Sequence, residues 1–289
     1  MYSENSQEPL FKQELQITST HHQKSIGMDI RLVLDDETKP LVIFVHGFKG
    51  FKDWGHFNLI ADEFARNGFI FAKINLSHNG TSPTDKRNFV DLEAFGHQTF
   101  TKDLHDIEDA INYFFSGDYL FKANTNLQEL YLVGHSRGGG LVILKALEDN
   151  RIKKVVTWAS ICDSKFLFNQ ERIEEIEQKG VIYIENARTK QQMPIYREVY
   201  EDLLKNSQKF DLEHRISQLQ VPLLLIHGKN DTSVSPKSSE NLKDWAKNAT
   251  LILLEDADHT FGGKEPYTDE LLPIHTDEMV DETIAFFKG

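Results

Sequence analysis

The chain has 289 residues, of which 39% are hydrophobic and 27% charged, the composition of a globular protein with one large or two small domains. Its 32 basic and 45 acidic residues give a net charge of −13. This balance argues against binding to nucleic acid or to an anionic membrane, because both need clustered cations. The single cysteine, Cys162, cannot form an intramolecular disulfide, and no Cys/His spacing indicates a zinc site.

The first twenty residues alternate polar side chains with single apolar ones and lack the apolar core of a signal peptide. No later apolar run approaches the length of a membrane-spanning helix. From these patterns we expect a cytoplasmic protein without a nucleic-acid or membrane partner.

Short apolar runs predict the strands of a sheet. Residues 11–17 and 29–34 alternate apolar and polar side chains and predict an antiparallel hairpin at the sheet edge. Later runs contain few polar residues, which is typical of parallel strands covered by helices on both faces. These buried strands are predicted at residues 41–45, 70–74, 130–133, 155–158, 223–226 and 251–254.

Amphipathic segments lie between the apolar runs and predict helices. Their apolar residues recur at spacings of three and four, so each helix would bury one face against the sheet. Alternating strands and helices favour an open, mainly parallel sheet with right-handed crossovers. The clearest of these helices are predicted at residues 57–64, 100–114, 141–147 and 280–287.

Residues 161–220 interrupt this alternation, because they contain no buried-strand run and are dominated by charged helix formers. We expect a helical cap inserted after the sixth strand of a single domain that spans residues 1–289. Within the insertion, Met193, Ile195 and Tyr196 could line an acyl pocket or could simply dock the cap.

A Gly-x-Ser-x-Gly pattern at residues 134–138 follows one predicted strand directly and leads into a predicted helix. This strand–turn–helix context is the one that a nucleophile elbow requires. Small residues are needed at Gly134 and Gly138, because side chains there would collide with the neighbouring strand and helix. The pattern indicates Ser136 as a nucleophile.

A serine nucleophile needs a histidine base and an acid that orients the histidine. Asp231 follows the predicted strand at 223–226, and His259 follows the one at 251–254, so both would emerge at the carboxyl edge of the sheet. Asp163, which follows the strand at 155–158, is the rival for the acid. We favour Asp231.

The tetrahedral intermediate of acyl transfer needs amide donors for its oxyanion. One predicted donor is the backbone N–H of Arg137, directly after the nucleophile. The second should come from the loop after the strand at 41–45, where Gly47 allows a turn that presents the N–H of Phe48. The same glycine-containing loop could also cap the helix that begins near His56.

The motifs at residues 46–48, 134–139, 227–231 and 258–261 together make the chain similar to the α/β-hydrolase superfamily. It most resembles the branch of small esterases and acyl hydrolases that includes cinnamoyl and feruloyl esterases and relatives of serine aminopeptidases. The resemblance runs from residue 41 to the last helix. It implies the α/β-hydrolase fold, a mainly parallel sheet flanked by helices, with a helical cap.

The resemblance also implies roles for the matched residues. Ser136 would be the nucleophile, His259 the base and Asp231 its orienter, with the amides of Phe48 and Arg137 as the oxyanion hole. At residues 75 and 79 asparagines replace the usual Asp and Gly of the loop after the fourth strand, a departure that concerns loop architecture.

We therefore expect a serine hydrolase that cleaves small-molecule carboxylic esters through an acyl-enzyme, with no metal or organic cofactor. A peptidase or amidase, or a thioesterase, could use the same three side chains. A non-catalytic binding protein of this fold is the alternative from another class. The sequence does not fix the natural substrate or the oligomeric state.

Overall fold

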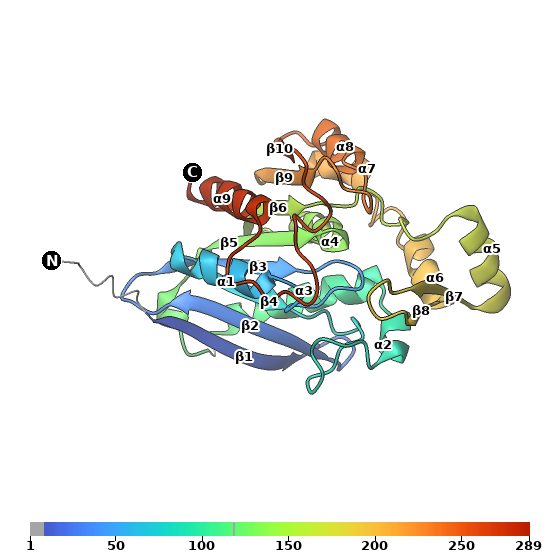
Figure 1. Ribbon diagram of the computed structural model, residues 1–289, viewed down its shortest axis with the longest axis horizontal. Helices are drawn as coiled ribbons and strands as arrows, with labels where there is room; N and C mark the ends of the chain where they lie inside the picture. The colour runs from blue at the N-terminus through green and yellow to red at the C-terminus, as the bar shows by residue number, and fades with distance from the viewer. Residues whose placement is uncertain (1–8, 118) are drawn as a thin grey trace.

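An eight-stranded sheet forms the centre of the protein, and the computed structural model describes residues 9–117 and 119–289 (Figure 1). The second strand pairs antiparallel with both of its neighbours, and all other neighbours in the sheet are parallel. The predicted edge hairpin and mainly parallel sheet are therefore confirmed. In spatial order the strands are β1 (Leu10–Thr18), β2 (Ser25–Val33), β4 (Ile70–Ile74), β3 (Lys39–Val45), β5 (Thr125–His135), β6 (Ile152–Trp158), β9 (Leu223–Gly228) and β10 (Ala249–Leu254).

Helices cover both faces of this sheet. One face packs against α3 (Phe100–Ser116), α4 (Arg137–Ala146), α7 (Leu212–Arg215) and α8 (Lys237–Trp245). The other face packs against α1 (Phe57–Arg66) and α9 (Ile274–Lys288). Two short 3-10 helices, η1 (Lys122–Asn124) and η2 (Ile216–Gln218), complete this layer structure.

Strand β3 shows why the central strands read as continuous apolar runs. Leu41, Ile43 and Val45 point into the core shared with α3 and α4, whereas Val42 and Phe44 point into the core shared with α1 and α9. Successive side chains of a strand face opposite sides, so a strand covered on both sides has no solvent-facing position. All five side chains are at most 1% exposed.

The insertion between β6 and β9 contains helices and a separate two-stranded antiparallel sheet. The prediction of a purely helical insertion is wrong in this respect. The two strands are short and stand among charged residues, so the apolar signal that identified the main strands is weak here. The insertion consists of α5 (Gln170–Lys179), β7 (Val181–Glu185), β8 (Gln192–Tyr196), α6 (Arg197–Lys205), α7 and η2.

A third apolar core joins the insertion to the body of the protein. From the insertion, Met193 and Ile195 are at most 2% exposed and pack with Phe51 and with Phe95, which belongs to α2 (Leu92–Gly96). Of the two roles that the sequence left open for these β8 residues, the structure shows docking of the insertion.

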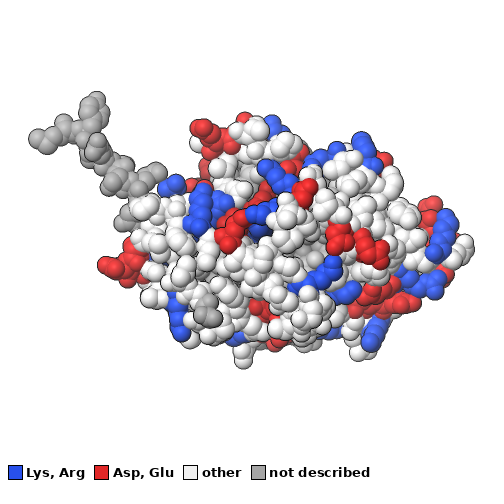
Figure 2. All heavy atoms as spheres, turned by 90° about the horizontal axis from the view of Figure 1, so that it is seen from below, with Lys and Arg blue, Asp and Glu red and all other residues white. Residues whose placement is uncertain are grey.

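Charged residues of both signs share the molecular surface. On the face drawn in Figure 2, the described acidic and basic side chains stand next to one another and form no broad basic area. Within residues 9–117 and 119–289, no helix combines the length and apolar character needed to cross a membrane.

Candidate active site

Ser136 lies at the sharp turn between β5 and α4, in the left-handed region of backbone conformation (φ 56°, ψ −118°). A non-glycine residue in such a conformation costs about 1–3 kcal/mol and persists only where its surroundings enforce it. Its N–H donates to the carbonyl of Trp158 on the neighbouring strand at 2.8 Å, and its own carbonyl accepts from Gly139 at 2.9 Å. The turn places the Ser136 side chain at the carboxyl edge of the sheet.

Glycines on both sides of Ser136 allow this turn. A Cβ atom on Gly138 would lie 2.2 Å from the carbonyl oxygen of Val45 in β3, and one on Gly134 would lie 2.2 Å from the carbonyl oxygen of Gly138. Both contacts are with backbone atoms, which cannot move aside as a flexible side chain can.

Gly138→Ala is therefore expected to destabilise the protein by about 3 kcal/mol or more, as an overpacked backbone contact does. Gly140→Ala, in the same helix, is the matched control, because its Cβ would meet only side-chain atoms of Ile161 and Leu212. Chemical denaturation of both variants measures the difference. Equal stability of the two variants would contradict the packing argument.

A continuous line of hydrogen bonds joins Ser136, His259 and Asp231. The Ser136 hydroxyl donates to His259 Nε2 at 3.1 Å, and His259 Nδ1–H donates to Asp231 Oδ2 at 2.7 Å. Ser136 and Asp231 are 8% and 6% exposed, so water competes little for these contacts. The structure thus brings together the three side chains that the sequence singled out as a candidate triad.

The two carboxylate oxygens of Asp231 have separate tasks. Oδ1 accepts the N–H groups of Ser233 and Val234, both at 2.8 Å, and so fixes the loop after β9. Oδ2 faces His259. Burial alone would raise the pKa of Asp231, but hydrogen bonds from His227 and His259 hold it well below its usual range. Asp231 is therefore a carboxylate at neutral pH.

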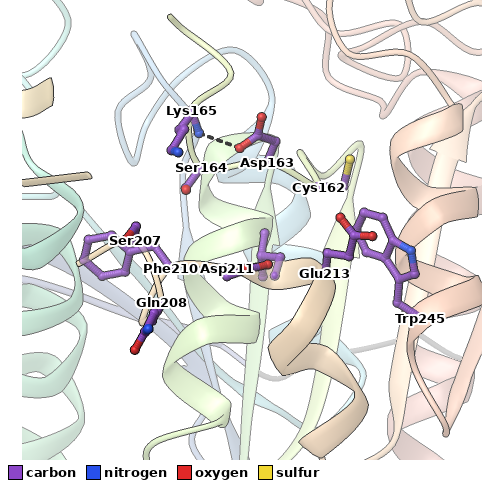
Figure 3. A pocket seen from close by; sticks show the side chains of 11 residues that line it. Cys162, Asp163, Ser164, Lys165, Ser207, Gln208, Phe210, Asp211, Glu213 and Trp245 are labelled. Atoms are coloured by element: carbon purple, nitrogen blue, oxygen red, sulfur yellow. Dashed lines mark hydrogen bonds between the residues drawn. The ribbon is translucent and has the colours of Figure 1, made fainter. Parts of the chain in front are cut away.

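Asp163, the rival for the acid, lies elsewhere. Its exposed side chain accepts the N–H of Lys165 at 2.8 Å and has no contact with His259. It lines a cavity of about 400 Å³ at the start of the insertion, which Cys162 and Trp245 also line (Figure 3). Neither Ser136 nor His259 borders this cavity.

The loop after β3 fixes the peptide that carries the Phe48 N–H. The N–H of Leu76 donates to His46 Nε2 at 3.2 Å, so the ring proton is on Nδ1, which donates to the Gly47 carbonyl at 2.9 Å. The Gly47 carbonyl and the Phe48 N–H point in opposite directions, because the peptide between them is planar and trans. Burial lowers the pKa of His46 to about 4, which keeps the ring neutral.

Gly47 also brings the loop after β3 against Ser136. A Cβ atom on Gly47 would lie 2.9 Å from the Cβ of Ser136 and 3.4 Å from its Oγ, so only glycine permits the approach. The loop that carries the predicted Phe48 donor therefore contacts Ser136. The residue after Ser136 is Arg137, whose N–H is the other predicted donor.

The side chain of Arg137, to which the sequence analysis assigned no role, anchors the elbow to α3. It is 3% exposed, forms a buried ion pair with Asp103, and lies 4.4 Å from the centroid of the Phe100 ring. Gln98 donates to the other carboxylate oxygen of Asp103 at 3.1 Å. Burial raises the pKa of Asp103 to about 6, and the positive charge of Arg137 limits this rise.

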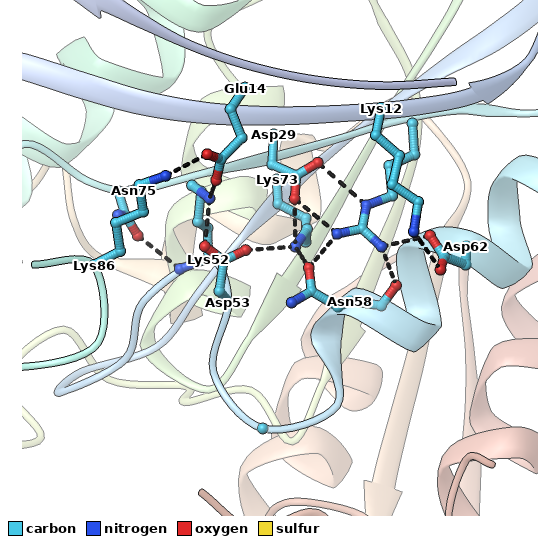
Figure 4. Close-up of polar contacts among 12 residues, drawn as sticks. Lys12, Glu14, Asp29, Lys52, Asp53, Asn58, Asp62, Lys73, Asn75 and Lys86 are labelled. Atoms are coloured by element: carbon cyan, nitrogen blue, oxygen red, sulfur yellow. Dashed lines mark hydrogen bonds and ion pairs between the residues drawn. The ribbon is translucent and has the colours of Figure 1, made fainter. Parts of the chain in front are cut away.

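A network of charges, most of them buried, holds the rest of the loop after β3 against β1, β2 and β4 (Figure 4). Lys73 pairs with Asp29 at 3.1 Å and with Asp53 at 2.9 Å, and Lys52 pairs with Glu14 at 2.8 Å. The carboxylates of Glu14, Asp29 and Asp53 lie within 4.8 Å of one another, as metal ligands would. Together with Arg31, which pairs with Asp29, and Lys86, which pairs with Glu14, these two lysines already neutralise the three carboxylates, so this set does not fit a metal ion.

Asn75 and Asn79, which depart from the usual family residues, serve the same loop. Asn75 Oδ1 accepts the N–H of Lys52 at 2.6 Å, and Asn79 Nδ2 donates to Asn75 Oδ1 and to the carbonyl of Gly50, both at 3.3 Å. Neither residue contacts Ser136, Asp231 or His259. The prediction that this departure concerns loop architecture agrees with these contacts.

Aromatic side chains surround Phe48. Its ring centroid lies 5.4 Å from that of Phe95 in α2 and 6.1 Å from that of Phe166 in the insertion. Trp54 packs between the core around Phe57 and the core that holds the insertion. The predicted oxyanion loop is thus also a contact of the insertion.

His227 and His135 contact the candidate triad and were missed in the sequence analysis. His135 Nε2–H donates to the backbone carbonyl of His259 at 2.9 Å. His227 contacts Asp231 directly, with Nε2 at 3.0 Å from Oδ2. The only sequence signal was position, since each histidine is the last or next-to-last residue of a strand that ends at the site.

His56 is buried beside the loop that carries His259. It is 2% exposed, its Nε2–H donates to Thr276 Oγ1 at 3.1 Å, and its Nδ1 has no partner among the described residues. Burial lowers the pKa of His56 to about 4, although the charge of Asp258 opposes this shift. A proton on this ring is therefore costly in the folded state.

His56→Leu is expected to cost about 1–2 kcal/mol of unfolding free energy at pH 7.5, through the lost hydrogen bond to Thr276. This deficit should shrink by about 1.4 kcal/mol per pH unit below pH 6.5 and reach zero or reverse by about pH 5, because unfolded wild type then binds a proton that the folded protein excludes, whereas leucine does not titrate. Urea unfolding of both proteins at pH 7.5, 6 and 5 measures this. A constant difference would contradict the argument.

Comparison with known families assigns the chain to one of them. The BD-FAE family model matches residues 28–246, which is more than half of the protein. The chain belongs to the BD-FAE family. A comparison with the curated proteins finds no match.

Solved structures share the fold. Est1E from Butyrivibrio proteoclasticus, solved with ferulic acid bound, aligns over 95% of this chain and 98% of its own, with TM-score 0.70 and 18% identity. An esterase domain from Rhodothermus marinus aligns over 87% and 91%, with TM-score 0.60 and 18% identity. The acylaminoacyl peptidase of Pyrococcus horikoshii aligns over 96% of this BD-FAE chain and 41% of its own, with TM-score 0.66 and 16% identity. The protein thus has an α/β-hydrolase fold.

Proposed function

We propose that this BD-FAE family member hydrolyses carboxylic esters of small molecules through an acyl-enzyme formed on Ser136. The observation that carries the proposal is the hydrogen-bond line from Ser136 Oγ through His259 to the ionised Asp231, built at a strand–helix elbow. Membership of the family and the fold shared with esterases support the same reaction class.

The proposed reaction has two halves. In the first, Ser136 Oγ attacks the ester carbonyl, its proton passes to His259 Nε2, and the imidazolium protonates the departing alcohol. In the second, His259 takes a proton from water, which attacks the acyl-enzyme, and the imidazolium then returns the proton to Ser136 Oγ as the acyl–oxygen bond breaks and the acid is released. Asp231 keeps the His259 proton on Nδ1 and stabilises the imidazolium in both halves.

The amides of Phe48 and Arg137 are the proposed oxyanion donors. The His46 ring and the Arg137–Asp103 ion pair hold the two loops that carry them, so the donors need not be reorganised during the reaction. We also propose that residues 161–220 act as a cap of a single hydrolase domain. The packing of Phe166 and Phe95 on Phe48 supports this role, because it brings the insertion to the proposed acyl site.

A thioesterase acting on an anionic thioester is the second candidate, and the surroundings of Lys49 favour it. Lys49 Nζ lies 5.7 Å from the centroid of the Phe48 ring and donates to the carbonyl of Glu185 at 3.3 Å. Burial, and after it the positive charge of Arg172, lowers the pKa of Lys49. An anionic group of a substrate would offset this charge repulsion.

A parallel assay on four substrate classes tests the proposal. It compares p-nitrophenyl acyl esters, a methyl hydroxycinnamate, an aminoacyl-p-nitroanilide and an acyl-coenzyme A, with a fluorophosphonate probe to label the nucleophile. We expect rapid ester cleavage, slow anilide turnover and labelling of Ser136. Preference for the anilide or the thioester would move the assignment to a peptidase or a thioesterase, and folded protein that is neither labelled nor active would refute a serine hydrolase.

A further inference from the structure

His227 lies behind the proposed triad, at the carboxyl end of β9, with no solvent exposure. Its Nε2 is 3.0 Å from Asp231 Oδ2 and 2.9 Å from the carbonyl oxygen of Val234. On the opposite side of the ring, Nδ1 lies 2.7 Å from Oγ of Ser239, a side chain of α8 that is also fully buried. Both ring nitrogens are therefore held.

These partners determine where the ring carries its proton. The Val234 carbonyl and the Asp231 carboxylate can only accept hydrogen bonds, so Nε2 must carry the hydrogen and shares it between them. The Ser239 hydroxyl can donate to Nδ1 of the neutral ring. Asp231 Oδ2 consequently accepts two ring N–H groups, one from His227 and one from His259.

We infer that His227 is a positioning residue for the proposed reaction, holding the Asp231 carboxylate in line with His259 and sharing its negative charge through the Nε2–H hydrogen bond. Ser239 extends this line, which then runs from Ser136 through His259, Asp231 and His227 to the hydroxyl of α8. The inference rests on the proposed function, since it assigns His227 to the same reaction.

The charge-sharing role has a directional consequence. Without the His227 donor, the charge of Asp231 is less dispersed and attracts the His259 imidazolium more strongly. The base is then protonated at a higher pH, so the acid limb of the kcat/KM profile should move upward. The orientation of Asp231 is also lost, which lowers kcat, whereas substrate binding does not involve His227 and KM should change little.

Two other titratable groups near His259 do not contribute to the acid limb of the kcat/KM profile. Burial, with a smaller effect of the charge of His259, lowers the pKa of His135 to about 3. Burial alone would raise the pKa of Asp258, but hydrogen bonds from the N–H groups of Gly262 and Thr260 hold it below its usual range. Neither group changes charge between pH 5 and 8, where the profile is measured. Among residues 9–117 and 119–289, Asp231 is the only carboxylate in contact with His227.

The test compares three variants with wild type on the best substrate of the four-class assay. His227→Leu removes the donor, and we expect kcat to fall about 10- to 100-fold with KM within about twofold. Its acid limb should rise by about 0.5–1 pH unit. His227→Gln can still reach Asp231 and should restore most of kcat and the wild-type acid limb, whereas the shorter His227→Asn should not.

The glutamine and asparagine variants keep the comparison informative if the leucine variant does not fold, because both place an amide at this site. His78→Gln is the matched control: it also replaces a buried histidine, 6% exposed, but follows β4, which is four strands away from β9 in the sheet. It should leave the acid limb unchanged.

Two failures of the test can be told apart. Wild type that neither turns over substrate nor reacts with the fluorophosphonate probe overturns the proposed function, and the inference with it. Active wild type accompanied by a His227→Leu or His227→Asn variant that keeps the wild-type acid limb, or by a glutamine variant no more active than the asparagine variant, overturns the positioning role alone.

Discussion

Ser136→Ala is expected to lower turnover by at least three orders of magnitude while the protein stays folded. The substitution removes one oxygen atom, whose one side-chain hydrogen bond within the described part of the chain is with His259 Nε2. The backbone of the elbow is held by its own hydrogen bonds and by the close approach of Gly138 to Val45, none of which involves the hydroxyl. Stability should therefore change by about 1 kcal/mol or less.

Turnover of the preferred ester, together with thermal unfolding, measures both parts of this prediction. Ser160→Ala is a matched control, because Ser160 is also buried and lies beside Gly139 of the elbow, but its hydroxyl donates to the carbonyl of Ile161. It should remain active. Ester cleavage by Ser136→Ala at a rate near that of wild type would overturn the proposed mechanism.

Asp231→Asn should reduce kcat by about three to four orders of magnitude, as loss of the orienting carboxylate does in the Ser-His-Asp triad. The asparagine carbonyl can keep the N–H bonds of the loop after β9, so its amide group then faces His259. An amide N–H donates, and His259 Nδ1 would have to accept. The ring proton would move to Nε2 and point at the Ser136 hydroxyl. His259 could then no longer accept the proton of that hydroxyl.

Asp163→Asn is the comparison variant, and we expect its activity within about twofold of wild type. The Asp163 carboxylate is exposed and accepts only a local backbone N–H, a bond that asparagine can also form. Steady-state kinetics of both variants, with circular dichroism to check folding, decides between the two acids. If Asp163→Asn is the damaging substitution, the acid has been misassigned.

The main sheet could be predicted from the sequence because a strand buried on both faces appears as a continuous run of apolar residues. Each of the six predicted buried strands lies within a strand of the structure, and the alternation at residues 11–17 and 29–34 marked the edge pair β1 and β2. The hairpin β7–β8 was missed because it packs only one face against the third core, and its other side chains, such as Tyr183 and Glu185, are exposed.

The candidate site could be predicted only in part. Local patterns identified Ser136, because the tight turn at this residue requires glycines within two positions on either side of it. The choice between Asp231 and Asp163 was harder, since both follow a buried strand, and only the path of the chain after β6 turns Asp163 toward solvent. The second contact of Asp231, with His227, and the pairing of Arg137 with Asp103 depend on distances between elements that no local pattern encodes.

The third apolar core has a consequence for exchanging parts between family members. Insertion residues such as Ile182 and Met193 are buried against Phe51, Phe89 and Phe95, which come from loops and from α2 of the body. A segment grafted in place of residues 161–220 would leave these three rings facing a foreign surface. A chimaera meant to transplant selectivity must therefore take two parts from the donor protein. These are the insertion and the residues at the positions of Phe51, Phe89 and Phe95.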